Sequence, residues 1–278
     1  MKAKAWFAAA AAGAALCLAL PFAVFAVWDR VLTARPQPLP ADDPALAGLL
    51  SAEGRADETA CLLYAAAHVF GVELSPLDLS GGWTQAAQQT LPPDTVRAAL
   101  AGESAAAENA WSAAAQQAAQ IAQDLRAAGL LAEDCWQAVA DGWDGTVTAE
   151  CYTAPGGLAR LRLWDENTGF DMAWTPQGVP VYVSLYDAAL PLGEAVTPGL
   201  LDGYLALAGL DEAFGDWQAI DWSARLPAAG ETAYSPAAQL YATASARDGL
   251  TLTLQSLPPD TVAKLARGEG GVEMRNEE

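Results

Sequence analysis

The spacing of hydrophobic residues changes near residue 145 of the chain. In residues 103–129, ESAAAENAWSAAAQQAAQIAQDLRAAG, Trp111, Ile121 and Leu125 fall on one face of a helix. Shorter stretches on either side have the same helical spacing, and glycines follow several of them. This pattern predicts a helical region over residues 45–145.

Alternation with a period of two replaces the helical spacing from about residue 146. In LARLRLW, Leu161 and Leu163 fall on one face of a strand, and the neighbouring arginines fall on the other. Similar short runs follow after glycine-bearing turns, and an Asp-Gly pair near residue 248 predicts a last hairpin. We therefore expect an α+β fold, in which 146–278 forms an antiparallel meander with helices, a C-terminal hairpin and a short final helix. This region is expected to form one globular unit with 45–145.

The hexapeptide LPPDTV occurs at residues 91–96 and again at 257–262. Each copy is a good helix start, because prolines fit the first turn and an aspartate stabilises the positive end of the helix dipole. Three explanations remain open for the repeat: convergence on one helix-start sequence, an ancient duplication, or a pair of binding elements.

The first residues of the chain predict membrane targeting. Residues 5–28 form an uncharged run of 24 residues, and about 20 helical residues span the hydrocarbon core of a bilayer. We expect an uncleaved signal anchor, with residues 1–4 as a cytoplasmic stub and the body outside the cytoplasm, because lysines precede the run. Cleavage after Ala26 and secretion is the alternative. Residues 29–44 are proline-rich and predict a stalk.

Charge limits the partners of the exported part. The chain carries 14 basic and 34 acidic residues, and all the acidic ones follow the predicted anchor. Such a surface repels phosphate backbones, so nucleic-acid binding is not expected.

Candidate catalytic and metal-binding residues are sparse. His68 is the chain's single histidine, and Cys61 precedes it by seven residues, so the two lie about 10 Å apart along one helix and form no dyad. We interpret His68 as structural. Cys135 and Cys151 could form a disulfide in an oxidising exterior, or remain free and buried. The spacing of cysteines and carboxylates predicts no metal site and no cofactor.

Two tryptophans near the predicted meander are candidate ligand-binding residues. Trp164 and Trp174 could stack on a sugar or grip a peptide if they lie exposed on one sheet face, although tryptophan is also a large core residue. The acidic pair Asp165 and Glu166 between them is expected to be solvated surface.

No catalytic constellation stands out, so we expect a non-catalytic binding or interaction module of the bacterial cell envelope. Its expected partner is another envelope or membrane protein. The alternatives are a secreted hydrolase that uses two carboxylates, and an envelope scaffold without a small ligand.

Overall fold

A computed structural model of the chain describes residues 62–63, 66, 83–102, 110–190, 197–220, 230–247 and 249–256. The chain divides into two compact units, Met1–Asp43 and Pro44–Glu278. All the described residues belong to the second unit, and the predicted anchor, stalk and final helix lie outside them. Among the described residues, no helix combines the length and apolar character needed to cross a membrane.

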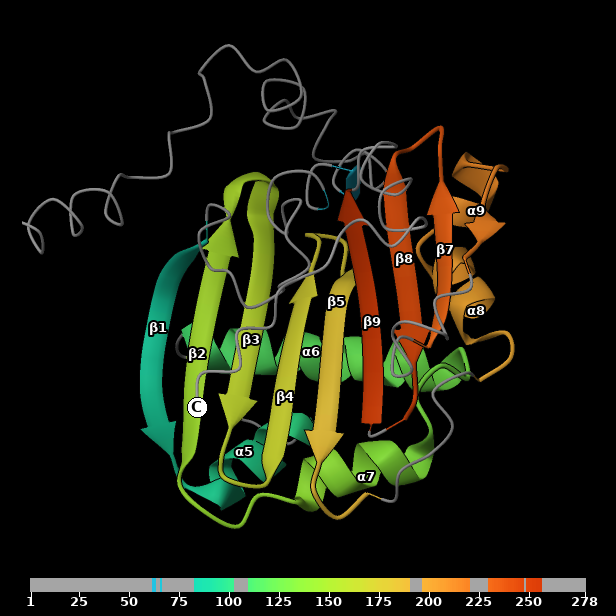
Figure 1. Cartoon of the computed structure of the whole chain (residues 1–278). Helices are drawn as coiled ribbons and strands as arrows, with labels where there is room; N and C mark the ends of the chain where they lie inside the picture. Colours follow the sequence, from blue (N-terminus) through green and yellow to red (C-terminus); the bar gives the residue numbers. More distant parts are fainter. Residues whose placement is uncertain are drawn as a thin grey trace, which may run out of the picture. The chain divides into compact units, whose positions relative to one another are not determined.

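The described part of the chain forms an α+β fold around one antiparallel sheet of nine strands (Figure 1). The spatial order is β1-β2-β3-β4-β5-β9-β8-β7-β6, so the predicted meander β2 to β5 is confirmed, and β8 and β9 form the predicted hairpin. The strands are β1 (Thr84–Leu91), β2 (Val147–Ala154), β3 (Leu158–Trp164), β4 (Thr168–Trp174), β5 (Pro180–Asp187), β6 (Gln218–Ala219), β7 (Glu231–Ser235), β8 (Leu240–Ser245) and β9 (Gly249–Ser256).

Helices cover one face of the sheet. In Figure 1, α5, α6 and α7 lie behind the strands, where α6 packs on β1 to β3 and α7 packs on β4 and β5. Farther along, α8 contacts β7 and β8. The helices are α5 (Pro93–Leu100), α6 (Ala110–Ala127), α7 (Glu133–Asp141), α8 (Leu200–Leu207) and α9 (Leu210–Ala213), with a short 3₁₀ turn, η2 (Pro155–Gly157), between β2 and β3.

Strand alternation gives the sheet two chemically different faces. Leu161 and Leu163 of β3 are fully buried on the helix-covered face. Arg160, Arg162 and Trp164 alternate with them and therefore lie on the opposite face. We call this opposite side of β2 to β5 the polar face.

The prediction of helix throughout 45–145 is wrong at residues 84–91, which form strand β1. The segment TQAAQQTL is rich in alanine and glutamine, which favour helix locally. It is nevertheless an edge strand, because its backbone pairs with β2 from Thr84 to Leu91, with one irregularity between Gln85 and Ala87. Tertiary pairing thus overrides the local preference.

The first LPPDTV copy starts helix α5 as predicted. Pro92 is the N-cap, Pro93 is the first helical residue and Asp94 lies in the first turn. The first residue of this copy, Leu91, is the last residue of β1, and the second copy begins directly after Ser256, the last residue of β9. Both copies therefore begin where a strand ends, although the second lies outside the described residues.

Candidate functional site

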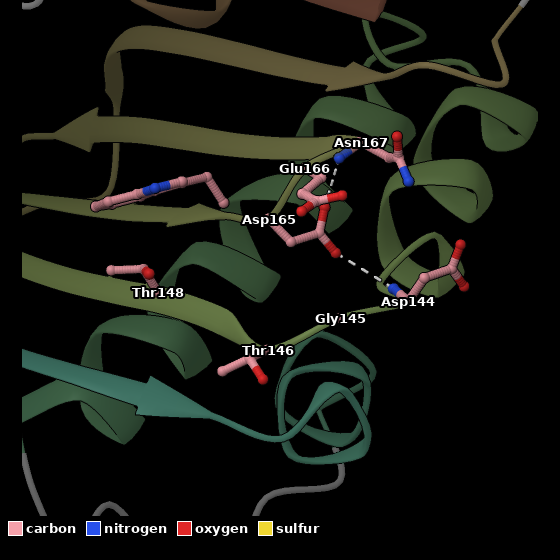
Figure 2. Close-up of a pocket in the computed structure, with 8 residues that line it drawn as sticks. Asp144, Gly145, Thr146, Thr148, Asp165, Glu166 and Asn167 are labelled. Carbon is pink, nitrogen blue, oxygen red and sulfur yellow. Dashed lines mark hydrogen bonds between the residues drawn. The ribbon is translucent and has the colours of Figure 1, made fainter.

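A hollow of about 640 Å³ lies where the β3–β4 turn meets the connection between α7 and β2 (Figure 2). The indole of Trp164 forms part of its wall, and the remaining groups are mostly polar. The lining residues are Asp144, Gly145, Thr146, Thr148, Trp164, Asp165, Glu166 and Asn167.

Asp165 holds the two walls of the hollow together. Its Oδ1 accepts hydrogen bonds from the backbone N–H groups of Asn167 at 2.9 Å and Thr168 at 2.8 Å, which closes the β3–β4 turn. Its Oδ2 accepts the backbone N–H of Asp144 from the opposite wall at 3.2 Å (Figure 2). This carboxylate is therefore a structural acceptor within the hollow.

The pKa of Asp165 follows from two opposing effects. Burial alone would raise this pKa, but the backbone N–H donors around the carboxylate together lower it below the usual range. The carboxylate consequently stays ionised at neutral pH. A general acid would need the opposite shift.

Replacing Asp165 with asparagine should therefore cost more stability at pH 7 than at pH 2. A depressed folded-state pKa stabilises the fold above the unfolded value, about 3.9 for aspartate, and this stabilisation is lost as pH falls through the folded pKa. We expect a small effect, because much of this side chain remains in solvent. Urea-unfolding midpoints of both proteins from pH 7 to pH 2 measure it, and a constant difference across that range would contradict the assignment.

A network of two arginines and two carboxylates occupies the polar face beside the hollow. Arg160 donates from Nε and Nη2 to the two oxygens of Asp171, each at 2.7 Å. Arg162 joins the network by donating to Asp171 at 3.1 Å and to Glu150 at 3.2 Å. Glu150 also accepts the hydroxyl of Tyr152 at 2.6 Å. The two positive and two negative charges balance within the network.

The arginines also order the neighbouring aromatic rings. The guanidinium carbon of Arg162 lies 5.0 Å from the ring centroid of Trp164, and that of Arg160 lies 5.6 Å from the ring centroid of Tyr182. Both distances fit cation–π contacts. Arg160 is fully buried, and its Nη1 has no hydrogen-bond partner among the described residues. The network thus fixes the orientation of Trp164 at the hollow.

The structure separates the two tryptophans that the sequence suggested as a joint binding site. Trp174 of β4 pairs with Ala159 of β3, so their side chains lie on the same face of the sheet. Ala159 and Trp164 are five residues apart on β3, and an odd separation along a strand puts two side chains on opposite faces. The two indoles therefore lie on opposite faces. Trp174 is buried on the helix-covered face with 1% of its surface exposed. It is a core residue, so the hypothesis of a two-tryptophan site is wrong and Trp164 alone remains.

The suggested disulfide is also absent, because Cys135 and Cys151 are both free. Cys135 lies in α7, and Cys151 is buried in β2. Burial raises the pKa of each thiol to about 11, and nearby Asp134 and Asp187 also raise that of Cys135. Neither thiol is appreciably ionised at neutral pH, so neither is an activated nucleophile.

The structure describes some of the other candidate residues and not others. His68 and Cys61 lie outside the described residues. Within the described ranges, no group of three or more histidine, cysteine, aspartate or glutamate side chains could hold a metal ion. The two acidic residues after β3 have different surroundings. The Asp165 carboxylate accepts hydrogen bonds within the β3–β4 turn, whereas Glu166 is exposed at the hollow.

Sequence reasoning missed two members of the charge network, Glu150 of β2 and Asp171 of β4. They meet the arginines of β3 only through strand register. One signal was present, because arginines alternating with leucines in β3 require counter-charges on the neighbouring strands.

No protein-family model, no curated protein and no solved structure matches this chain.

Proposed function

We propose that this protein is a non-catalytic binding module of the bacterial cell envelope that takes its ligand in the hollow beside Trp164. The observation that carries this proposal is the composition of the hollow wall. Trp164 is half-buried and lines the hollow together with the polar residues Thr148, Glu166 and Asn167. A ligand in the hollow would therefore meet an aromatic ring and hydrogen-bonding side chains at the same time.

The charged groups around Trp164 favour binding over hydrolysis. Asp165 is held ionised by backbone donors, and Asp171 is shared between two guanidinium groups. A carboxylate hydrolase needs an acid whose pKa is raised, together with a second free carboxylate nearby. Asp165 and Asp171 instead fix the shape of the site.

The cellular placement in this proposal rests on the sequence. Residues 5–28 would anchor the chain in the cell membrane, with the N-terminus cytoplasmic and the body outside. Protease shaving of intact cells, with mass spectrometry of the mature N-terminus, tests this placement. Retention of residues 1–26 with digestion of the body supports the anchor. A chain that begins at Val27 and appears in the medium would replace it with secretion.

Binding is tested by co-sedimentation of the full-length protein, in mild detergent, with insoluble envelope material of the producing bacterium. We expect Trp164→Ala to reduce the sedimented fraction at least tenfold, because a buried tryptophan anchor contributes 2 kcal/mol or more in typical interfaces, roughly a thirtyfold change. Trp217→Ala is the matched control, since Trp217 is another half-buried tryptophan that does not line the hollow. Equal sedimentation of the wild type and Trp164→Ala would contradict the proposal.

A further inference from the structure

The hollow beside Trp164 carries negative charge without a counter-charge in its lining. Three of its eight lining residues are acidic, namely Asp144, Asp165 and Glu166, and none of the eight is lysine, arginine or histidine. Asp144 comes from the connection between α7 and β2, whereas the other two come from the β3–β4 turn, so acidic residues stand on both walls (Figure 2). A group that enters the hollow therefore meets negative charge from two sides.

Arg162, which contacts the Trp164 ring, does not cancel this charge. Its guanidinium group already donates to Asp171 and Glu150, and the network that it belongs to is neutral within itself. Among the described residues, no ion pair involves any of the three acidic residues of the hollow. Their charge is thus available to a ligand.

The carboxylates of the β3–β4 turn differ in what they can offer. Asp165 is engaged, because it accepts backbone N–H groups from both walls of the hollow. Glu166 is exposed, and its carboxylate has no hydrogen-bond or ion-pair partner among the described residues. Asp165 therefore holds the shape of the hollow and adds to its negative field, whereas Glu166 is the carboxylate that a ligand can reach.

The acidic residues of the hollow do not converge as metal ligands do. Within the described ranges, no group of three or more histidine, cysteine, aspartate or glutamate side chains could hold a metal ion. The hollow measures about 640 Å³, which lies in the range of small-molecule sites, about 300–1,000 Å³. Separated carboxylates around a space of this size suit a bulky organic cation better than a small inorganic one.

The indole of Trp164 supplies apolar contact for such a cation. Methylene groups beside an ammonium group pack on apolar surface while the charge stays with polar partners, and tryptophan is the aromatic residue that attracts cations most strongly. The ring already has one guanidinium carbon 5.0 Å from its centroid, and it also lines the hollow. A neutral ligand would leave the acidic residues without a partner, and an anion would be repelled by them.

We infer that the hollow binds an organic cation, an ammonium group on an apolar stem, with the stem against Trp164 and the charge beside Glu166. This inference rests on the proposed function and names its ligand class. Two sources carry this chemistry, a free diamine and a lysine side chain in a peptide. The formal charge of −20 draws either of them toward the protein.

Isothermal titration calorimetry of the full-length protein, in mild detergent at low salt, tests the inference. The probes are 1,5-diaminopentane and a glycine-lysine-glycine peptide with blocked ends, each compared with its N-acetylated form. At least one amine should bind about tenfold more tightly than its acetylated form, because acetylation removes the positive charge. The probe that binds more tightly identifies the source of the ammonium group. Equal binding of the amines and their acetylated forms would overturn the inference.

Glu166→Gln shows whether the charge acts at the hollow. This variant should weaken amine binding at least about fivefold while the melting temperature stays unchanged, because Glu166 is exposed and its carboxylate has no partner among the described residues. Glu212→Gln is the matched control, since Glu212 is an exposed residue of α9 that does not line the hollow, and its replacement removes the same charge. Equal weakening by the two variants would show that the net charge alone attracts amines, and the assigned site would be wrong.

The two proposals fail in different ways. If the wild type sediments with envelope material through Trp164, but neither amine binds and acetylation of the amines in that material leaves sedimentation unchanged, the proposed function holds and the cation inference is wrong. If an amine binds through Glu166 and nothing sediments, the cation inference holds and the ligand is a soluble amine instead of envelope material. If the wild type neither sediments nor binds an amine, both proposals fail.

Discussion

Replacing Arg160 with methionine is expected to lower the free energy of unfolding by about 3 kcal/mol, the lower end of the cost of breaking a buried ion pair. Arg160 is fully buried and holds both oxygens of Asp171. Its removal leaves the carboxylate, which is 14% exposed, with Arg162 as its cationic partner among the described residues. Methionine fills similar space but supplies neither charge nor donors. Urea unfolding followed by tryptophan fluorescence measures the loss.

Two further variants show whether the buried pair is the cause. Arg160→Met combined with Asp171→Leu should recover a substantial part of the loss, because replacing both partners by apolar groups removes the uncompensated charge. Arg126→Met breaks the surface pair between Arg126 and Glu133, whose side chains are 29% and 69% exposed, and should cost less than about 1 kcal/mol. Equal losses for Arg160→Met and Arg126→Met would show that burial adds nothing to the Arg160 pair.

Gly249→Ala is expected to destabilise the fold by about 2–4 kcal/mol through steric overlap and an unfavourable backbone angle. Gly249 begins β9 with φ +137°, and a Cβ there would lie 1.8 Å from the carbonyl oxygen of Leu185. That oxygen belongs to β5, which pairs with β9, so the two strands would have to separate locally. The melting temperature should fall by roughly 5–10 °C.

Gly215→Ala is the matched control for this prediction. A Cβ at Gly215 would meet nothing within 4 Å, and its φ is not positive. Alanine there should change stability little, or raise it slightly by restricting the unfolded chain. A Gly249→Ala protein as stable as the Gly215→Ala protein would contradict the predicted overlap.

Local sequence pattern predicted the elements that have strong periodicity. The stripe containing Trp111, Ile121 and Leu125 became the buried side of α6, and the alternation in LARLRLW became β3. These predictions succeed because one amphipathic element must bury one apolar side, whatever it packs against. The strand β1 was missed because its alanines and glutamines favour helix. Only the pairing with β2 explains why this segment is extended.

The candidate site could be predicted only in part. Trp164 was named from composition, and the paired arginines of β3 were visible as the polar half of an alternating strand. Trp174 looked equivalent in the sequence. It pairs with Ala159, which is five residues from Trp164 on β3, so it lies on the opposite, buried face. Glu150 and Asp171 carry no local signal, because each acquires its role from an arginine on a neighbouring strand.

The sequence by itself determined the α+β character of the described part, the meander and the helix start at LPPDTV, since periodicity and capping act over a few neighbouring residues. The tertiary structure alone decided which face each side chain occupies relative to distant strands. A shift of one residue in register would move every side chain of a strand to the other face. The charge network and the hollow both depend on that register, and they exist only once the strands are paired.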